Sequence, residues 1–227
     1  MAIQWYKRSD SFLRDTAPRI SFRKEHIGYN AVFVKVANLN QYNRVRIGID
    51  YDTYEIYFQF LSQDENDKNT EGKFTDTLAC YPDNPNDLTK STGAQKLYEH
   101  NALLRNLSED ENHRQFAVQQ NSTDPSLWFA QLHPTFEYTV KSNADPKSLR
   151  GIYRYLNNRD VVYIGKGVIE SRLNSPQRTK WVYDTIEYSI VNDSQKQFEF
   201  EHLWIERYKE EHNGKLPFYN QNSGRGH

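Results

Sequence analysis

The sequence lacks several features that would define a scaffold or a location. Its 227 residues include a single cysteine, Cys80, which excludes an internal disulfide framework and a zinc site built from cysteines. No apolar run approaches the roughly 20 residues that a membrane-spanning helix needs. The first residues also lack the apolar segment of a secretory signal. These absences predict a cytoplasmic protein with no membrane partner.

An excess of charge is also lacking, because 29 lysines and arginines face 30 aspartates and glutamates. This balance excludes a global field that would draw the chain to nucleic acid or to a membrane. The local distribution is uneven: residues 1–50 carry nine basic and four acidic side chains, whereas residues 51–150 carry nine and sixteen. The basic opening segment is a candidate phosphate-contacting surface, and an ordinary solvated face is the alternative.

Aromatic residues, in contrast, are abundant: 16 tyrosines, 12 phenylalanines and 4 tryptophans. They supply enough large apolar surface for a core, although hydrophobic residues make up only 37% of the chain. Short β-branched and aromatic runs at 31–36, 44–49 and 54–61 predict three antiparallel strands. Leucines near a 3.6-residue period predict a helix over 92–107, and an extended segment is expected at 136–140.

Beyond residue 150 the pattern changes. Two apolar stretches, 151–156 and 161–165, surround a turn rich in Asn and Asp, which predicts a hairpin. A third strand is expected at 184–191. A long helix is expected over 194–212, with Ser194 as its N-cap.

We therefore predict an α+β chain of two domains, divided at the polar segment 141–146. Residues 1–145 would form a mostly antiparallel β domain that includes a helix. Residues 146–227 would form a three-stranded antiparallel sheet flanked by helices.

Two tripeptides of the second domain suggest a function. Residues 151–153 read GIY and residues 163–165 read YIG, with nine residues between them. One tripeptide alone would carry no information, but the pair at this spacing inside a hairpin resembles the signature of the GIY-YIG nuclease superfamily. The resemblance covers residues 150 to about 222, a third of the chain, and nothing before Arg150 takes part in it.

Downstream residues extend the resemblance. Arg172 follows the tyrosine of YIG by nine residues, where members of the family carry an arginine. Residues 201–208, EHLWIERY, and 217–220, PFYN, match the family patterns Glu-x-x-x-Ile-x-x-Tyr and Pro-x-Tyr-Asn. Pro176 departs from the family, because many members have a tyrosine or histidine four residues after the arginine. The departure leaves three candidates for the general base: Tyr153 alone, His202 and Tyr183.

The resemblance implies a role in phosphodiester hydrolysis for each of four residues. Glu201 would hold a divalent cation, Mg²⁺ or Mn²⁺, because a single carboxylate leaves positions for water and phosphate oxygens. Arg172 would bind the scissile phosphate through its fork of donors. Tyr153 would accept the proton of the attacking water, and Tyr163 would position that nucleophile or share its proton.

Neighbouring residues would support these roles or compete for them. A phenol with the usual pKa of about 10 is a poor base at pH 7, so Tyr153 needs a nearby cation, and Lys166 is the expected one. Asn220 would fix the surroundings of Tyr153 by hydrogen bonds, and Gly151 and Gly165 are the glycines of the two motifs. The competing residues are Arg178 and Lys180 for Arg172, Glu199 and Glu206 for Glu201, and Asn222 for Asn220.

We therefore expect a metal-dependent DNA endonuclease of restriction or host-defence type, with targeting by the first domain. Since one module has one active site, cutting both strands would require a homodimer. Basic side chains interleaved with Phe22, Tyr29, Phe33 and Tyr42 would contact phosphates and stack on bases, and an ordinary β-sheet domain is the equal alternative. The basic residues are Arg19, Arg23, Lys24, Lys35, Arg44 and Arg46.

Three other functions remain open at this point. One is a nucleic-acid-binding protein whose nuclease fold is inactive, which the proline at position 176 favours. The others are a DNA-repair nuclease and a homing-type nuclease. In those two classes the catalytic module usually comes first, whereas here the motifs come last.

Overall fold

The computed structural model describes residues 16–62, 77–83, 88–140, 149–173 and 175–220. The chain divides into two compact units. The first unit comprises residues 1–48, 57–95 and 112–130. The second unit comprises residues 49–56, 96–111 and 131–227. The boundary expected at 141–146 lies outside the described residues.

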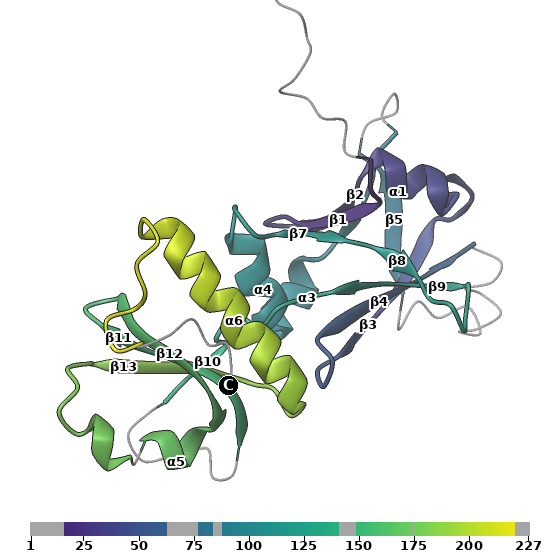
Figure 1. Cartoon of the computed structure of the whole chain (residues 1–227). Helices are drawn as coiled ribbons and strands as arrows, with labels where there is room; N and C mark the ends of the chain where they lie inside the picture. The colour runs from purple at the N-terminus through teal and green to yellow at the C-terminus, as the bar shows by residue number, and fades with distance from the viewer. Residues whose placement is uncertain (1–15, 63–76, 84–87, 141–148, 174, 221–227) are drawn as a thin grey trace, which may run out of the picture. The chain divides into compact units, whose positions relative to one another are not determined.

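Most of the first unit is one antiparallel sheet of nine strands (Figure 1). In sheet order the strands are β7 (Gln115–Ala117), β1 (Arg19–Phe22), β2 (His26–Tyr29), β6 (Lys90–Gly93), β5 (Leu78–Pro82), β3 (Arg44–Asp50), β4 (Glu55–Leu61), β9 (Leu127–Gln131) and β8 (Gln119–Gln120). The two outer strands, β7 and β8, are separated in the chain by Val118 alone. The sheet therefore curves back on itself and is nearly closed, like a barrel.

The core of this unit is built from aromatic rings. Phe33 and Phe58 are fully buried, and Tyr29 is 1% exposed. The Tyr29 ring meets Phe33, Phe58 and Phe60 edge-on, with centroids 5.4–6.0 Å apart. Such contacts add to the stabilisation that comes from burying the rings.

Two expectations for this region are wrong. Residues 31–36 form the helix α1 (Ala31–Val36), because the Asn30 side chain caps it by accepting a hydrogen bond from Phe33 N. The helix expected over 92–107 is interrupted: its start is strand β6, followed by α3 (Gln95–His100) and α4 (Ala102–Glu109). Asn101 separates the two helices and caps α4 through Leu104 N.

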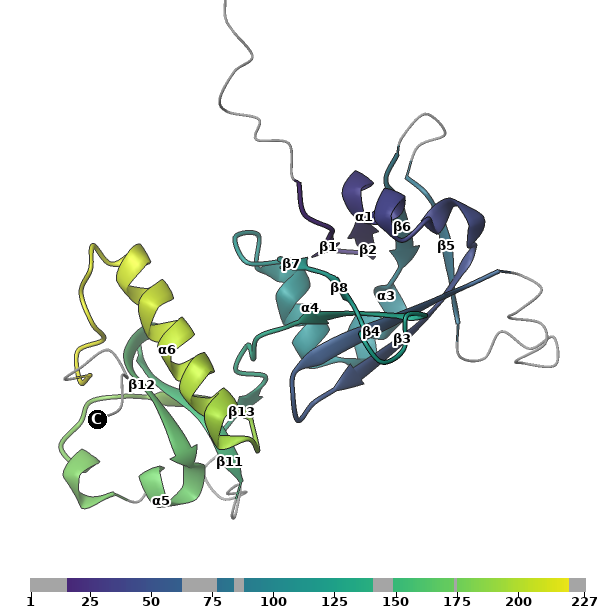
Figure 2. The ribbon, with the colours of Figure 1, turned by 45° about the vertical axis from the view of Figure 1, so that its right-hand side comes forward.

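The second unit contains a four-stranded antiparallel sheet in the order β10 (Tyr138–Thr139), β13 (Thr185–Ile190), β11 (Arg150–Asn157) and β12 (Asp160–Val168). The long helix α6 (Ser194–Glu211) and the short helix α5 (Ile169–Leu173) lie on opposite sides of this sheet (Figures 1 and 2). A short 3₁₀ helix, η2 (Pro176–Arg178), follows α5.

The hairpin β11–β12 forms as the sequence predicts. Its turn residues, Asn158 and Arg159, have φ of 51° and 73°, the left-handed conformation that a two-residue hairpin turn requires. Gly151 begins the first motif because a Cβ there would lie 1.9 Å from the carbonyl oxygen of Ser189 on β13. No other residue would let these two strands pair.

The predicted α+β fold class is wrong, because the chain is mostly β with few helices. The expected three-stranded sheet is also wrong. The segment Tyr138–Thr139 pairs with Tyr188 and Glu187 of β13 and adds a fourth strand. The strands near 44–49, 54–61 and 184–191 and the helix near 194–212 are confirmed, although Asp193, rather than Ser194, caps that helix. Among the described residues, no helix is long and apolar enough to cross a membrane.

Candidate functional site

Three tyrosine hydroxyls of the hairpin meet at one guanidinium group. Tyr153 and Tyr155 are two residues apart on β11, so they lie on the same face of the sheet. Tyr163 pairs with Tyr155 across the hairpin, and the three ring centroids are 5.7–6.1 Å apart. We call these three residues and Arg178 the tyrosine–arginine cluster.

Arg178 reaches this cluster from η2. Its Nη2 donates to the hydroxyls of Tyr163, at 3.1 Å, and Tyr153, at 3.3 Å. Its Nη1 donates to Tyr155 at 3.0 Å. The Arg178 residue is 8% exposed, and the Trp181 ring lies 5.0 Å from the guanidinium carbon. The three phenols and the indole thus enclose the cation, which compensates for its lost hydration.

Gly165 explains why the second motif ends in glycine. It pairs with Tyr153 in the hairpin, and a Cβ at this position would lie 2.8 Å from the Tyr153 hydroxyl and 2.6 Å from the Tyr163 ring. Both distances are shorter than a carbon atom allows. The glycine therefore makes room for the two phenols to approach each other.

The environment changes the proton affinity of the buried phenols. Burial raises the pKa of Tyr153 above its usual value, the neighbouring Tyr163 raises it further, and Arg178 lowers it in part. Burial also raises the pKa of Tyr155, again opposed by Arg178. Tyr153 is therefore protonated at neutral pH, and Arg178 is the group that favours its ionisation to a phenolate.

A second group of side chains surrounds Glu201 on helix α6. The Lys166 ammonium binds Glu201 Oε2 at 2.9 Å and lies 3.6 Å from the centroid of the Phe198 ring. Arg172, an exposed residue of α5, acts electrostatically on the same carboxylate. Burial raises the pKa of Glu201 above its usual value, whereas Lys166 and Arg172 lower it. We call Lys166, Arg172 and Glu201 the carboxylate group.

Strand β12 separates the two sets of residues. Tyr163 and Lys166 are three positions apart on this strand, so their side chains point to opposite faces. The backbone of Lys166 connects them, because the Tyr153 hydroxyl donates to the Lys166 carbonyl oxygen at 3.4 Å. Lys166 therefore pairs with Glu201, whereas Arg178 takes the place beside Tyr153 that we expected for Lys166.

Asn220 ties the end of the chain to this strand. Its Oδ1 accepts from Ile164 N at 2.9 Å, and its Nδ2 donates to Ile164 O at 2.8 Å. Tyr219 N also donates to Val162 O at 2.9 Å. The segment thus satisfies backbone groups of β12, an outer strand of its sheet, on either side of Tyr163.

The carboxylate group is compatible with one divalent cation. Lys166 takes Glu201 Oε2, and the described residues make no hydrogen bond to the other oxygen, Oε1. No group of three His, Cys, Asp or Glu side chains gathers within the described ranges. A cation would therefore have Glu201 as its single protein ligand there, an arrangement that suits Mg²⁺ because this ion retains several waters.

The basic residues expected to bind DNA have different environments. Arg23, Lys24 and Lys35 are exposed. Arg19 is half-buried, Arg44 donates to Thr77, and Arg46 donates to Gln59. The aromatic residues expected between them as stacking faces are mostly core: Phe22 and Phe33 are fully buried, and Tyr29 is 1% exposed. That stacking expectation is wrong for these three rings.

Arg178 and Tyr155 belong to the tyrosine–arginine cluster although the family pattern gives neither of them a position. Arg178 appeared only as a competitor of Arg172, because the family pattern locates its arginine by spacing. The signal for Tyr155 was its position two residues after Tyr153, on the same strand face. Of the alternatives, Lys180 is exposed, Glu199 pairs with Lys196 and Glu206 pairs with Lys209. Asn222 lies outside the described residues.

In comparisons with known proteins, no family model matches the chain, and no curated protein and no solved structure is significantly similar to it.

Proposed function

We propose that this protein is a metal-dependent DNA endonuclease that hydrolyses phosphodiester bonds. One observation carries the proposal: the GIY and YIG motifs place Tyr153 and Tyr163 on a shared guanidinium, and Lys166 connects that cluster to the Glu201 carboxylate. An activated water, a phosphate-binding cation and a metal-binding acid are the parts that phosphodiester hydrolysis requires. The hairpin and helices α5 and α6 supply residue types for all three.

The two arginines, Arg172 and Arg178, would have different roles. Arg172 is exposed and close enough to Glu201 to lower its pKa, so a phosphate beside that carboxylate would be within its reach. Its two parallel donors suit two phosphate oxygens. Arg178 is buried among the phenols and would bind no substrate. Its role would be to fix the hydroxyls and to stabilise a phenolate.

In the structure the Tyr153 hydroxyl donates to Lys166 O and the residue is 1% exposed, so Tyr153 would have to release that hydrogen bond before it could orient an attacking water beside Glu201. To accept the proton of that water it must become a phenolate, and the charge of Arg178 favours this form. Tyr163 donates no described hydrogen bond and accepts one from Arg178, so its hydroxyl proton remains available to the nucleophile. A divalent cation held by Glu201 would supply Lewis-acid stabilisation of the charge that develops on the phosphate.

Nicking of supercoiled plasmid DNA with Mg²⁺ tests the proposal. We expect Glu201→Ala to lower the rate about 100-fold or more, because Glu201 is the only protein ligand proposed for the cation. Glu199→Ala is the matched control: Glu199 lies on the same helix, its side chain is 47% exposed, and the rate should not change. Arg172→Ala should abolish turnover while DNA binding persists. Equal rates for wild type and Glu201→Ala would refute the proposal.

An inactive nucleic-acid-binding protein is the second candidate. Its supporting observation is the raised pKa of Tyr153, since a buried, protonated phenol is a poor base. DNA binding without cleavage of any unmodified or modified DNA, with Mg²⁺ or Mn²⁺, would favour this candidate. A labelled transcript in the same assay would detect cleavage of RNA.

Targeting by the first unit and a role in host defence are further parts of the proposal. The exposed residues Arg23, Lys24 and Lys35 are available for phosphate contacts. Replacing all three by glutamine should weaken DNA binding and reduce its salt dependence by a slope of about 3. End sequencing after digestion of a phage DNA panel would show whether cleavage is site-specific. Sedimentation with and without DNA would show whether a homodimer forms.

A further inference from the structure

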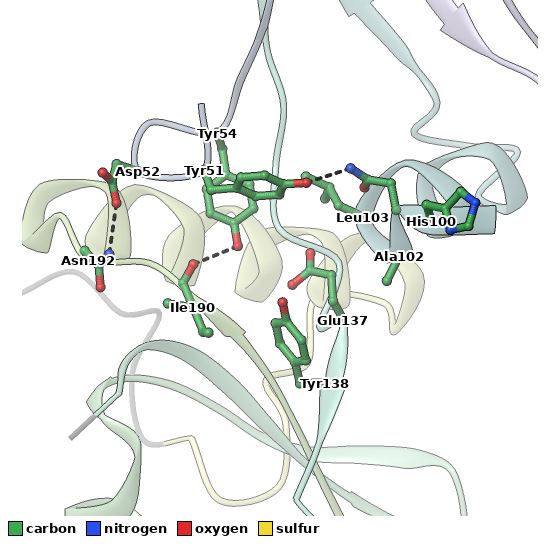
Figure 3. Close-up of a pocket in the computed structure, with 11 residues that line it drawn as sticks. Tyr51, Asp52, Tyr54, His100, Ala102, Leu103, Glu137, Tyr138, Ile190 and Asn192 are labelled. Atoms are coloured by element: carbon green, nitrogen blue, oxygen red, sulfur yellow. Dashed lines mark hydrogen bonds between the residues drawn. The ribbon is translucent and has the colours of Figure 1, made fainter. Parts of the chain in front are cut away.

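A cavity in the second unit has no part in the proposed hydrolysis. Its volume is about 400 Å³, which lies within the range of small-molecule sites. Figure 3 shows the side chains around it. Its wall includes Tyr51, Tyr54, Tyr138, Asp52, Glu137 and Leu103.

Three phenol rings form much of the cavity wall. The Tyr54 hydroxyl donates to Ile190 O at 2.8 Å, and Asn101 Nδ2 donates to the Tyr51 hydroxyl at 2.7 Å. These bonds hold two of the rings in place (Figure 3). The third ring, Tyr138, stacks on Tyr188 with centroids 5.3 Å apart. The cavity thus has preformed aromatic faces, of the kind that attract a cation.

The charge of the wall is negative. The described lining residues include two carboxylates, Asp52 and Glu137, and one histidine, His100, but neither lysine nor arginine. Glu137 Oε1 accepts from Thr135 N at 2.7 Å and from Thr135 Oγ1 at 3.1 Å. The other oxygen, Oε2, is buried and has no hydrogen-bond partner among the described residues. Burial without a partner is costly for a carboxylate.

The charge of Glu137 acts on the surrounding rings. Burial raises the pKa of the Tyr54 hydroxyl, and Glu137 raises it further. The same two causes raise the pKa of Tyr138. Glu137 therefore lies close to both phenols, and the wall, as far as the structure describes it, has no lysine or arginine that would compensate its negative charge.

We propose that this cavity binds an organic cation that carries N–H donors on a short alkyl chain, such as a primary ammonium compound. The cation would compensate the charge of Glu137 through space, even where a ring stands between them, and its alkyl chain would lie against the phenol faces and Leu103. An anion would be repelled by both carboxylates. A neutral ligand would leave Glu137 without compensation.

Calorimetric titration of the full chain with n-butylammonium chloride, at constant ionic strength, tests this site. We expect saturable binding of one molecule and none of the neutral 1-pentanol, which has a similar length. Glu137→Gln keeps the shape of the side chain but removes its charge, and should weaken binding about tenfold or more. The matched control is Glu199→Gln on the exposed side of α6, which should bind as wild type does.

A second variant keeps the test valid if Glu137→Gln does not fold. Tyr138 is 47% exposed, so Tyr138→Leu should fold, as circular dichroism would show, and should weaken binding several-fold. Titration with Nα-acetyl-lysine methylamide separates a lysine side chain from a free amine as the source of the cation, and binding of either supports the site. Absence of binding by both probes at millimolar concentration, or equal affinity in wild type and Glu137→Gln, would overturn the proposal.

Discussion

The two units use aromatic rings in opposite ways. In the first unit, the rings of Phe33, Phe58 and Phe60 pack around Tyr29, whose hydroxyl donates to Thr92 Oγ1 at 2.8 Å. The Tyr29 hydroxyl is satisfied there by a neutral hydrogen bond. In the second unit, the buried rings of the hairpin are tyrosines, and their hydroxyls converge on the guanidinium of Arg178.

The two kinds of buried ring have different consequences for stability and for reactivity. Burying apolar rings stabilises the fold without placing any reactive group. Burying phenols and a guanidinium is costly unless every donor and acceptor is paired, but it fixes hydroxyl positions and changes their pKa. The first arrangement is typical of a structural core, and the second is typical of a site.

The largest expected effect concerns the first core alone. Phe58 is fully buried, so Phe58→Ala should lower the free energy of unfolding by about 3–5 kcal/mol through lost burial and a cavity. Urea unfolding would measure this loss, and nicking per folded molecule should stay unchanged. Phe218→Ala is the control, since Phe218 is 80% exposed, and it should change stability by less than about 0.5 kcal/mol. Loss of nicking activity in folded Phe58→Ala would show that the core of the first unit does more than stabilise the fold.

Arg178→Met should affect chemistry more than stability. We expect the nicking rate to fall about 10²–10³-fold, as after the removal of other preorganised donors. Because Arg178 lowers the pKa of Tyr153, its removal raises that pKa, and the limb of the pH–rate profile on which the rate rises as Tyr153 loses its proton should move to higher pH. Lys180→Met, an exposed neighbour, is the control. A normal rate with an unshifted profile would assign Arg178 a structural role only.

A matched pair of hydroxyl deletions sharpens the comparison. Tyr29→Phe removes one neutral hydrogen bond and should cost about 1 kcal/mol of unfolding free energy. Tyr155→Phe leaves a buried guanidinium N–H without its 3.0 Å acceptor and should cost about 1.5–3 kcal/mol. Thermal or urea unfolding of both variants measures the difference. Equal losses of unfolding free energy would show that the hydrogen bond of Tyr155 to Arg178 stabilises the fold no more than the neutral hydrogen bond of Tyr29 does.

The smallest effect is a pH dependence at Glu201. Its pKa in the folded protein lies above its usual value of 4.5, chiefly through burial. As pH falls through the raised pKa towards 4.5, wild type binds a proton more readily when folded and gains stability. Glu201→Gln has no such proton to bind. The difference in Tm, wild type minus variant, should therefore grow as pH falls from 7 to about 4.5, and a constant difference would contradict the raised pKa.

Local patterns predicted the hairpin well. The apolar stretches on either side of an Asn/Asp turn define β11 and β12 because the turn needs left-handed residues, which asparagine tolerates. The same reasoning failed at 31–36, where β-branched residues favour a strand but the Asn30 cap selects a helix. The extended segment expected at 136–140 does contain a strand, Tyr138–Thr139, but the sequence pattern did not indicate that this strand pairs with β13 as the fourth strand of the sheet.

The sequence by itself determined which residues of the second unit are candidates for chemistry: the tyrosines of the two motifs, the arginines after them and Glu201. Only the tertiary structure decided how they pair. It placed Arg178 on the phenols and Lys166 on Glu201, and it brought residues 51–54 and 100–103 to the cavity beside Glu137. Spacing along a chain specifies the face of a strand or helix, whereas the partner of a buried charge depends on which elements pack against that face.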